Sequence, residues 1–154
     1  MKTIIRVQME AFSVGDEYER LTHDPDCGAV VTFTGLVRDL PHAAIQALEL
    51  EHYPEMTERM LQGIADQARQ RWSVRGITII HRIGRLTRNQ PIVFVGVASA
   101  HRHSAFQAAE FIMDFLKTRA PFWKKEETSD TCYWVAAKAS DQRAAKRWEQ
   151  DSAQ

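Results

Sequence analysis

Residues 92–118, with the sequence IVFVGVASAHRHSAFQAAEFIMDFLKT, lead a β-strand directly into a long α-helix. The first part of this stretch, 92–100, is apolar and valine-rich, which is typical of a buried strand. Ser104 and Gln107 have the spacing of a capping box, and apolar residues recur after them at helical intervals, so the helix is expected from about 104 to 118. The stretch therefore predicts a fold that mixes strands and helices.

The segments on both sides have periodicities of their own. Residues 45–53 alternate, with leucines and a histidine on one face and glutamates on the other, as expected of a half-buried strand. This strand follows the preceding one, 29–37, too closely for a parallel crossover. The fold class predicted is therefore α+β, a sandwich with a mainly antiparallel sheet. Further strands are expected at 4–7, 77–83 and 132–138, and further helices after Ser13, at 54–72 and at 141–150.

The chain has 154 residues and contains no repeat, low-complexity segment or linker. A single domain covering residues 1–154 is therefore expected, and it is long enough to bury a core. The side chains expected in that core are Leu61, Ile64, Ala65, Ala68 and Trp72 of one helix, Phe106, Phe111, Met113, Phe115 and Leu116 of another, and the remaining tryptophans.

Charge and composition exclude several classes of protein. Twenty basic and twenty acidic residues cancel, which argues against binding nucleic acid through bulk electrostatics. The apolar runs are too short to span a bilayer, and the N-terminus lacks the apolar region of a signal peptide. Cys27 and Cys132 have neither CxxC nor metal-ligand spacing. We therefore expect a reduced, cytoplasmic protein that does not bind membranes.

The junction between the strand and the helix, residues 98–104, predicts an anion-binding site. The unpaired N–H groups of a helix start and the positive end of its dipole point outward there. Arg102 adds a planar group of donors that suits phosphate or carboxylate. The competing interpretation is an ordinary capped helix start with solvated side chains. The two histidines of this junction could instead form half of a metal site with His52 or His81, although no Asp, Glu or Cys has ligand spacing.

A second stretch, residues 117–126 (KTRAPFWKKE), has four basic residues and a single acid at its end. Its proline and aromatic residues predict a stiff, partly desolvated loop, in which a lysine loses its proton more easily. Lys117 also closes a helix, where the dipole favours a cation, and the sequence leaves open which effect is larger. A basic helix cap followed by a solvated loop is one alternative. Lysines beside Phe122 and Trp123 would also suit a module that holds RNA or a phosphorylated ligand.

Several blocks, in order along the chain, resemble the large subunit of molybdopterin synthase. They are residues 28–38 (GAVVTFTGLVR), 50–56 (LEHYPEM), 80–84 (IHRIG) and 98–126. The similarity runs from about Phe12 to Trp148, and several ordered blocks are more specific than one short motif. The resemblance implies a two-layer α/β hammerhead fold and a homodimer.

The resemblance also implies an activity and a partner. Members of the family convert cyclic pyranopterin monophosphate to molybdopterin by transferring two sulfurs, in molybdenum cofactor biosynthesis. The sulfurs arrive on the thiocarboxylated C-terminal Gly-Gly tail of a small ubiquitin-like sulfur-carrier subunit, in a heterotetramer with two small subunits. This chemistry requires no cofactor or metal, and no cysteine of the large subunit, which agrees with the ordinary sequence settings of Cys27 and Cys132.

The site residues implied by the resemblance fall into two groups. The lysine before Thr-x-Ala-Pro and the lysine after Phe-Trp are the catalytic pair, which places them at Lys117 and Lys124. The individual roles of the two lysines stay open, and so does the question whether Lys138 reaches a pocket across the dimer interface. An inactive scaffold that only binds the small subunit is a further alternative, and the intact lysine pair argues against it. The substrate-binding residues implied are Leu36, Val37, Arg38, His101, Arg102, Lys124, Lys125 and Glu126.

Overall fold

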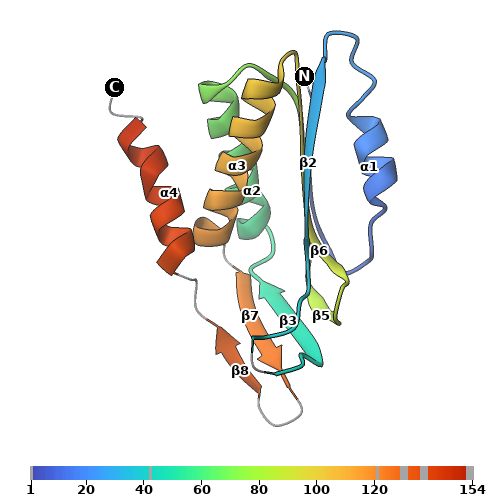
Figure 1. Ribbon diagram of the computed structural model, residues 1–154, viewed down its shortest axis with the longest axis vertical. Coiled ribbons are helices and arrows are strands. Elements are labelled where there is room, and N and C mark those ends of the chain that lie inside the picture. The colour runs from blue at the N-terminus through green and yellow to red at the C-terminus, as the bar shows by residue number, and fades with distance from the viewer. Residues whose placement is uncertain (1, 42, 121, 129–131, 136–138, 152–154) are drawn as a thin grey trace.

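The computed structural model describes residues 2–41, 43–120, 122–128, 132–135 and 139–151. Within them the chain forms eight strands and four helices, and the strands make two four-stranded sheets. The sheet that we name the upper sheet, from its place in Figure 1, has the order β1 (Lys2–Gln8), β4 (Val74–Arg82), β6 (Pro91–Ser99) and β2 (Ala29–Leu36). The lower sheet has the order β5 (Gly84–Leu86), β3 (Ala47–His52), β7 (Phe122–Glu127) and β8 (Cys132–Val135).

Strand pairing confirms the mainly antiparallel α+β fold that the sequence predicts. Among the named pairs only β1 and β4 run parallel, with Thr3 opposite Ile77. The other pairs in both sheets are antiparallel. The structure adds that β2 and β3, although consecutive in the chain, lie in different sheets and do not pair with each other.

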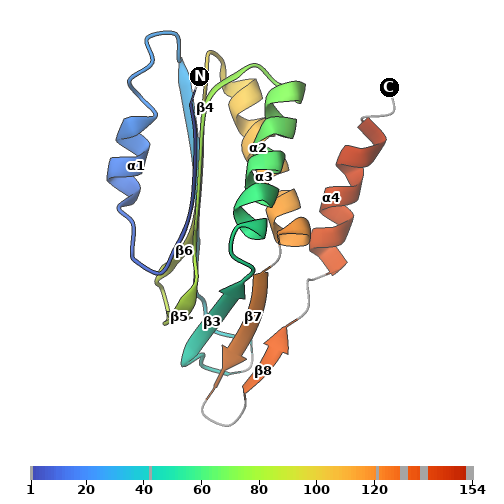
Figure 2. The same ribbon diagram turned by 180° about the vertical axis from the view of Figure 1, so that it is seen from behind.

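The helices are α1 (Val14–Arg20), α2 (Met56–Arg71), α3 (Arg102–Arg119) and α4 (Ala139–Asp151). Figures 1 and 2 show α2 and α3 side by side on one face of the upper sheet, and α1 on the opposite face. Helix α4 packs against α3 on the side away from the sheet. The start of α1 is as predicted, because the side chain of Ser13 accepts a hydrogen bond from the backbone N–H of Asp16.

The main core lies between the upper sheet and the helix pair α2 and α3. The predicted stripe of α2 is confirmed, since Leu61 and Ala65 are fully buried, and Phe111 and Ile112 of α3 meet it. Each large apolar side chain buried in this way contributes about 1.5–3 kcal/mol. A second, smaller cluster joins the end of β2 to one face of the lower sheet; its buried members are Val37, Ile45, Leu48, Leu50 and Leu86.

Two predicted core residues are exposed instead. Phe106 is 59% exposed, because the buried face of α3 passes through Ala105, Ala108 and Ala109 and leaves position 106 outside it. Trp123 is 41% exposed, because it lies in a strand on the face opposite to the buried one. The other aromatic residues named for α3, Phe111 and Phe115, are buried as predicted.

Helix α3 begins at Arg102, two positions before the predicted start, so the capping box of Ser104 and Gln107 is wrong. The hydroxyl of Ser99 fixes the turn into the helix instead. It donates to the carbonyl oxygen of His101 at 2.6 Å and accepts from the backbone N–H of His101 at 3.1 Å. The last residue of β6 thus sets the geometry of the first turn of α3.

The largest departure from the prediction is β7, because most of the basic stretch expected to form a loop is a strand. Phe122–Glu127 pairs with β3 on one side and with β8 on the other. Its sequence is too charged to show the apolar alternation that predicts a strand. Neighbouring strands on both sides determine its conformation, and their pairing is not visible in the local sequence.

Candidate active site

Two lysines that the sequence singles out approach one buried imidazole. Lys117 lies in the last turn of α3, Lys124 lies in β7, and His81 is near the end of β4. The charges of both lysines act on the His81 ring. The chain therefore brings Lys117 and Lys124 to the same site, at the junction between the two sheets.

His81 is a neutral residue inside this basic site. Its side chain is 6% exposed, and its ring stacks on that of Phe122 with centroids 3.8 Å apart and planes 19° apart. Burial is the main cause that lowers the pKa of His81 from 6.5 to about 4; a backbone hydrogen bond opposes the shift, and the two lysines and His52 add to it. The ring is therefore uncharged at neutral pH.

The tautomer of His81 follows from the hydrogen bond made by its Nδ1 atom. Its Nδ1 lies 2.8 Å from the carbonyl oxygen of Arg82. A carbonyl oxygen only accepts, so Nδ1 carries the proton and Nε2 keeps its lone pair. The lysine site thus contains a fixed acceptor beside two cations.

A second histidine, His52, borders the same site from β3. In the strand register it lies directly opposite Phe122, and the two ring centroids are 6.3 Å apart. The Nδ1 atom of His52 is buried without a hydrogen-bond partner, although the residue as a whole is only half-buried. Phe122 therefore has one imidazole stacked on it and another opposite to it.

Strand alternation divides the three neighbouring candidates of β7 between two faces. Lys124 lies opposite Leu50 and Glu126 lies opposite Leu48, so both share the face that carries the buried leucines. Lys125 lies opposite Glu49, on the other face of the lower sheet. The structure thus places Lys124 and Glu126 on the site side of β7 and Lys125 on the far side.

Of the three candidate residues at the end of β2, Val37 is the one that packs against the lower sheet. Val37 is 2% exposed and belongs to the same apolar cluster as Leu50, the residue opposite Lys124. Its backbone is fixed by bonds in both directions with residues 89 and 90. Leu36 and Arg38 on either side of it are exposed. Val37 therefore belongs to the apolar layer beneath Lys124. Arg38, next to it in the chain, is exposed to solvent.

The remaining candidates, His101 and Arg102, lie at the opposite end of α3. They line an open depression together with His103, Phe106 and Gln107. Arg102 and Lys117 are the first and the sixteenth residue of the helix, so a rise of 1.5 Å per residue puts their backbones about 22 Å apart. One chain therefore presents a lysine site and a histidine–arginine site that do not meet.

Two alternatives for the function lose support from this arrangement. His52 and His81 lie at the lysine end of α3, so they cannot complete a metal site with the two histidines at its start. In the part of the chain that the structure describes, no group of three or more potential metal ligands comes together. Of the two aromatic residues in the basic stretch, Phe122 stacks inward on His81, and Trp123 is the one that is exposed for stacking an RNA base.

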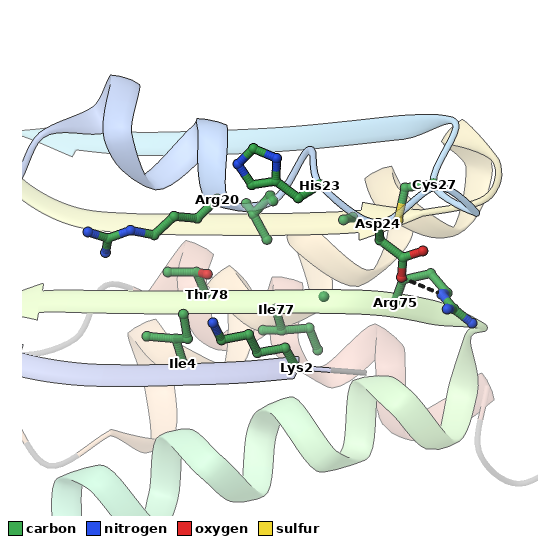
Figure 3. A pocket seen from close by; sticks show the side chains of 12 residues that line it. Lys2, Ile4, Arg20, His23, Asp24, Cys27, Arg75, Ile77 and Thr78 are labelled. Atoms are coloured by element: carbon green, nitrogen blue, oxygen red, sulfur yellow. Dashed lines mark hydrogen bonds and ion pairs between the residues drawn. The ribbon is translucent and has the colours of Figure 1, made fainter.

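A cavity of about 310 Å³ lies elsewhere, under α1 on the face of the upper sheet away from α2 and α3. Figure 3 shows Lys2, Thr78 and His23 around it. At one end, Arg75 donates to Asp24 at 2.8 Å, and this hydrogen bond lowers the pKa of the carboxyl group. None of the candidate site residues lines this cavity, so we attribute it to the packing of α1 and not to the site.

The sequence identified the lysines but not the residues that surround them. From the sequence, the role open to His52 and His81 is metal binding, and the roles open to Phe122 are stiffening of the basic loop and stacking on RNA. One feature of the sequence could have identified His52. It lies on the leucine face of an alternating strand, where a polar side chain is unfavourable unless it makes a hydrogen bond. Lys138, for which the sequence left a role open, lies outside the described residues.

Comparison with known proteins gives consistent matches over almost the whole chain. The family model described as "MoaE protein" matches residues 7–119. The chain is 58% identical to the molybdopterin synthase catalytic subunit of Yersinia pestis, over 95% of this chain and 97% of that protein. It is 57% identical to the protein of the same name from Escherichia coli strain K12, over 96% and 99%.

Solved structures agree with the sequence matches. The structure of the molybdopterin biosynthesis MoaE protein from Burkholderia ambifaria MC40-6 superimposes with a TM-score of 0.82 and 45% sequence identity, covering 96% of this chain and 98% of that chain. Within the described residues, no helix has both the length and the apolar composition needed to cross a membrane. The matches extend through both lysines, because the relatives cover 95% or more of the chain.

Proposed function

The chain belongs to the MoaE protein family, and from this premise we propose that it acts as the catalytic subunit of a molybdopterin synthase. Its substrate is then cyclic pyranopterin monophosphate, which receives two sulfurs and becomes molybdopterin, in molybdenum cofactor biosynthesis. The observation that carries the proposal is that Lys117 of α3 and Lys124 of β7 both lie near enough to the buried ring of His81 for their charges to lower its pKa. A cluster of cations beside a buried, uncharged acceptor suits an anionic substrate whose charge changes during the reaction.

The two lysines have different surroundings and therefore different tasks. Lys117 is exposed at the end of α3, where an incoming group can reach it. We assign to it the step closest to the chemistry, as proton carrier or as transient acceptor of the partner's acyl group. Lys124 is half-buried on the leucine face of β7 and stabilises the negative charge that develops there.

The sulfur donor is a second protein. The relatives are named catalytic subunits, which means that at least one further subunit exists for them. For this chain we propose a small ubiquitin-like sulfur carrier whose C-terminal Gly-Gly tail, as a thiocarboxylate, enters the lysine site. Two such carriers in succession supply the two sulfurs, and the complex is a heterotetramer of two large and two small subunits.

The distance between the two halves of the site supports a homodimer with shared sites. A backbone separation of about 22 Å along a rigid helix is too large for the anionic end of one small substrate to contact both Arg102 and Lys117 of one chain. A two-fold dimer can place the start of α3 from one protomer beside the end of α3 from its partner. We propose that each complete site combines the lysine pair of one protomer with His101 and Arg102 of the other.

We further propose that residues 1–154 work as one domain in the cytoplasm. The apolar cluster that contains Val37 and Leu50 ties the lower sheet to the upper one, which supports a single unit. A reduced compartment also agrees with Cys27, whose pKa is raised mainly by burial, so that its thiol stays protonated.

The proposal is tested by reconstitution of the reaction. The protein is mixed with thiocarboxylated small subunit and cyclic pyranopterin monophosphate, and molybdopterin is measured after oxidation to its fluorescent derivative. Lys117→Ala is expected to lower product formation by at least a hundredfold while the variant still binds the small subunit, because it removes a group that takes part in the chemistry. Lys146→Ala, at an exposed lysine of α4, is the matched control and should turn over normally. A stable complex with the small subunit that yields no product with the wild-type protein would instead indicate a binding role alone.

A further inference from the structure

The Nδ1 atom of His52 is the one buried side-chain nitrogen or oxygen that lacks a hydrogen-bond partner in the described part of the chain. A buried polar atom without a partner destabilises the folded state, because it has lost its hydrogen bonds to water and gained none in return. Native proteins keep few such atoms, and each one calls for an explanation, such as a role in the chemistry of a site. The remainder of the residue is half-exposed, so His52 lies at the boundary between the protein interior and the solvent.

The position of His52 relates this unpartnered atom to the lysine site. His52 lies opposite Phe122 in the β3–β7 pair, and Leu50 lies opposite Lys124 two residues further along. His52 and Lys124 are therefore diagonal neighbours on the same face of the sheet, with backbones about 7–8 Å apart. Their side chains are long enough to contact the same small group from two sides.

The chemistry of the two neighbours is complementary. A lysine ammonium group only donates hydrogen bonds, whereas a neutral imidazole offers one nitrogen as an acceptor. A ligand that uses both must present an acceptor to Lys124 and a donor N–H to His52 within a few ångströms. The last residue of a peptide has this arrangement, because its terminal carboxylate or thiocarboxylate and its own amide N–H are attached to the same α-carbon.

We propose that His52 is a further binding residue of the lysine site, and that its Nδ1 accepts a hydrogen bond from the terminal amide N–H of the partner's C-terminal tail. This inference rests on the proposed function, since that function supplies the tail. A glycine tail suits the position because the atom is buried and a residue without a β-carbon approaches it more closely than any other. The hydrogen bond orients the terminal carbonyl carbon toward the lysines before any sulfur moves.

Two substitutions separate the nitrogen atoms of the ring. The side-chain amide of asparagine occupies nearly the place of Nδ1, and that of glutamine nearly the place of Nε2. His52→Asn is therefore expected to keep the contact, and His52→Gln to remove it while remaining polar and similar in size. Comparable melting temperatures of the two variants would show that both are folded.

The experiment measures the affinity of the dimeric protein for two forms of the small subunit by titration calorimetry, one complete and one lacking its last two residues. We expect His52→Gln to bind the complete form roughly tenfold more weakly than wild type and the shortened form equally well. His52→Asn should bind both forms as the wild type does. In the wild-type protein, the nitrogen-15 resonance of Nδ1 should shift with the complete form only.

Each other outcome overturns the inference in a recognisable way. Equal affinity of His52→Gln and wild type for the complete form would show that Nδ1 makes no contact with the tail. Equal weakening toward both forms would make His52 part of the general docking surface. Normal tail binding with impaired binding of cyclic pyranopterin monophosphate would assign the atom to the pterin instead. A wild-type protein that binds neither form of the small subunit would contradict the proposed function itself, and a wild type that binds both forms equally would contradict only the inference.

Discussion

A single side chain, His81, determines the charge of the lysine site. Were its ring protonated, it would add a third positive charge near Lys117 and Lys124, and the charges of both lysines oppose that state. Burial excludes the proton even more strongly than the lysines do. Because the neutral ring is fixed as the Nδ1–H tautomer by Arg82, its acceptor nitrogen is in place before any ligand arrives. His81 is therefore a preorganised part of the site.

The neutrality of His81 predicts how stability depends on pH. The folded pKa of about 4 lies below the unfolded value of 6.5, so the unfolded chain binds more protons and stability falls as the pH falls through this range. Because of His81, the free energy of unfolding falls by about 2 kcal/mol between pH 8 and pH 5. Urea unfolding should therefore show that the free energy of unfolding falls less between pH 8 and pH 5 for His81→Phe than for the wild type. His23→Gln, at an exposed histidine, serves as the control, and identical losses in all three proteins would contradict the assignment.

The cysteines provide a second prediction for single residues. Sulfur reaches the site on the small subunit, and the raised pKa of Cys27, caused mainly by burial, leaves its thiol a poor nucleophile. The double variant Cys27→Ser, Cys132→Ser is expected to keep turnover within about twofold of wild type in the reconstituted assay. Loss of activity in a variant that still folds would mean that this chain carries sulfur itself.

Among the elements, β7 decides which basic side chains face the chemistry. Its alternation directs Lys124 toward the leucine face and Lys125 toward the opposite one. A loop would have allowed all of its lysines to reach the substrate, as the sequence suggested. Paired as a strand between β3 and β8, the segment directs Lys124 and Lys125 to opposite faces of the lower sheet.

This alternation predicts unequal effects of two adjacent substitutions. Lys124→Ala should lower kcat by about a hundredfold, because it removes a charge that stabilises the reacting group. Lys125→Ala should lower kcat by less than about fivefold, because its side chain lies on the far face of the sheet. Steady-state kinetics in the reconstituted assay checks both values. Equal losses would show that β7 does not keep its register in the working complex.

The elements also show how far the sequence was sufficient. Helices α2 and α3 and strand β3 were predictable because their apolar residues recur at the period of the element that they form, and β6 because it is a short, continuous apolar run rich in valine. Strand β7 was not predictable, because its half-buried lysines and glutamates break the apolar pattern by which a strand is recognised. The lysine pair was identified from the family resemblance, whereas its contact with His81 depends on pairing between distant strands.

For the whole molecule, the separation of the two half-sites is the reason for proposing that the dimer is the catalytic unit. Arg102 and Lys117 terminate the same rigid helix, so no bending of a side chain brings them together within one chain. If each site takes its lysines from one protomer and its arginine from the other, two inactive variants can restore each other. A site within one chain would not allow this restoration.

Complementation tests the shared site directly. Lys117→Ala and Arg102→Ala are each expected to be nearly inactive alone. After the two variants are unfolded together and refolded at equal concentration, half of the dimers are mixed, and one of the two sites in each mixed dimer is intact. Activity should therefore return to about a quarter of the wild-type value. Two samples refolded separately and then combined briefly serve as the control. No recovery in refolded mixtures that contain mixed dimers would place both residues in the site of a single chain.

The parallel pairing of β1 with β4 also has a consequence for how the protein is made. Strand β1 leaves the ribosome before residues 74–82, its partner in the upper sheet, and β2 must wait still longer for β6. At about 5–20 residues per second, synthesis needs roughly 4–15 s to produce the partner of β1. During that interval two apolar strands of the nascent chain have no sheet to join. The first half of the polypeptide is thus the part most exposed to aggregation, and the part that a chaperone acting during translation would protect.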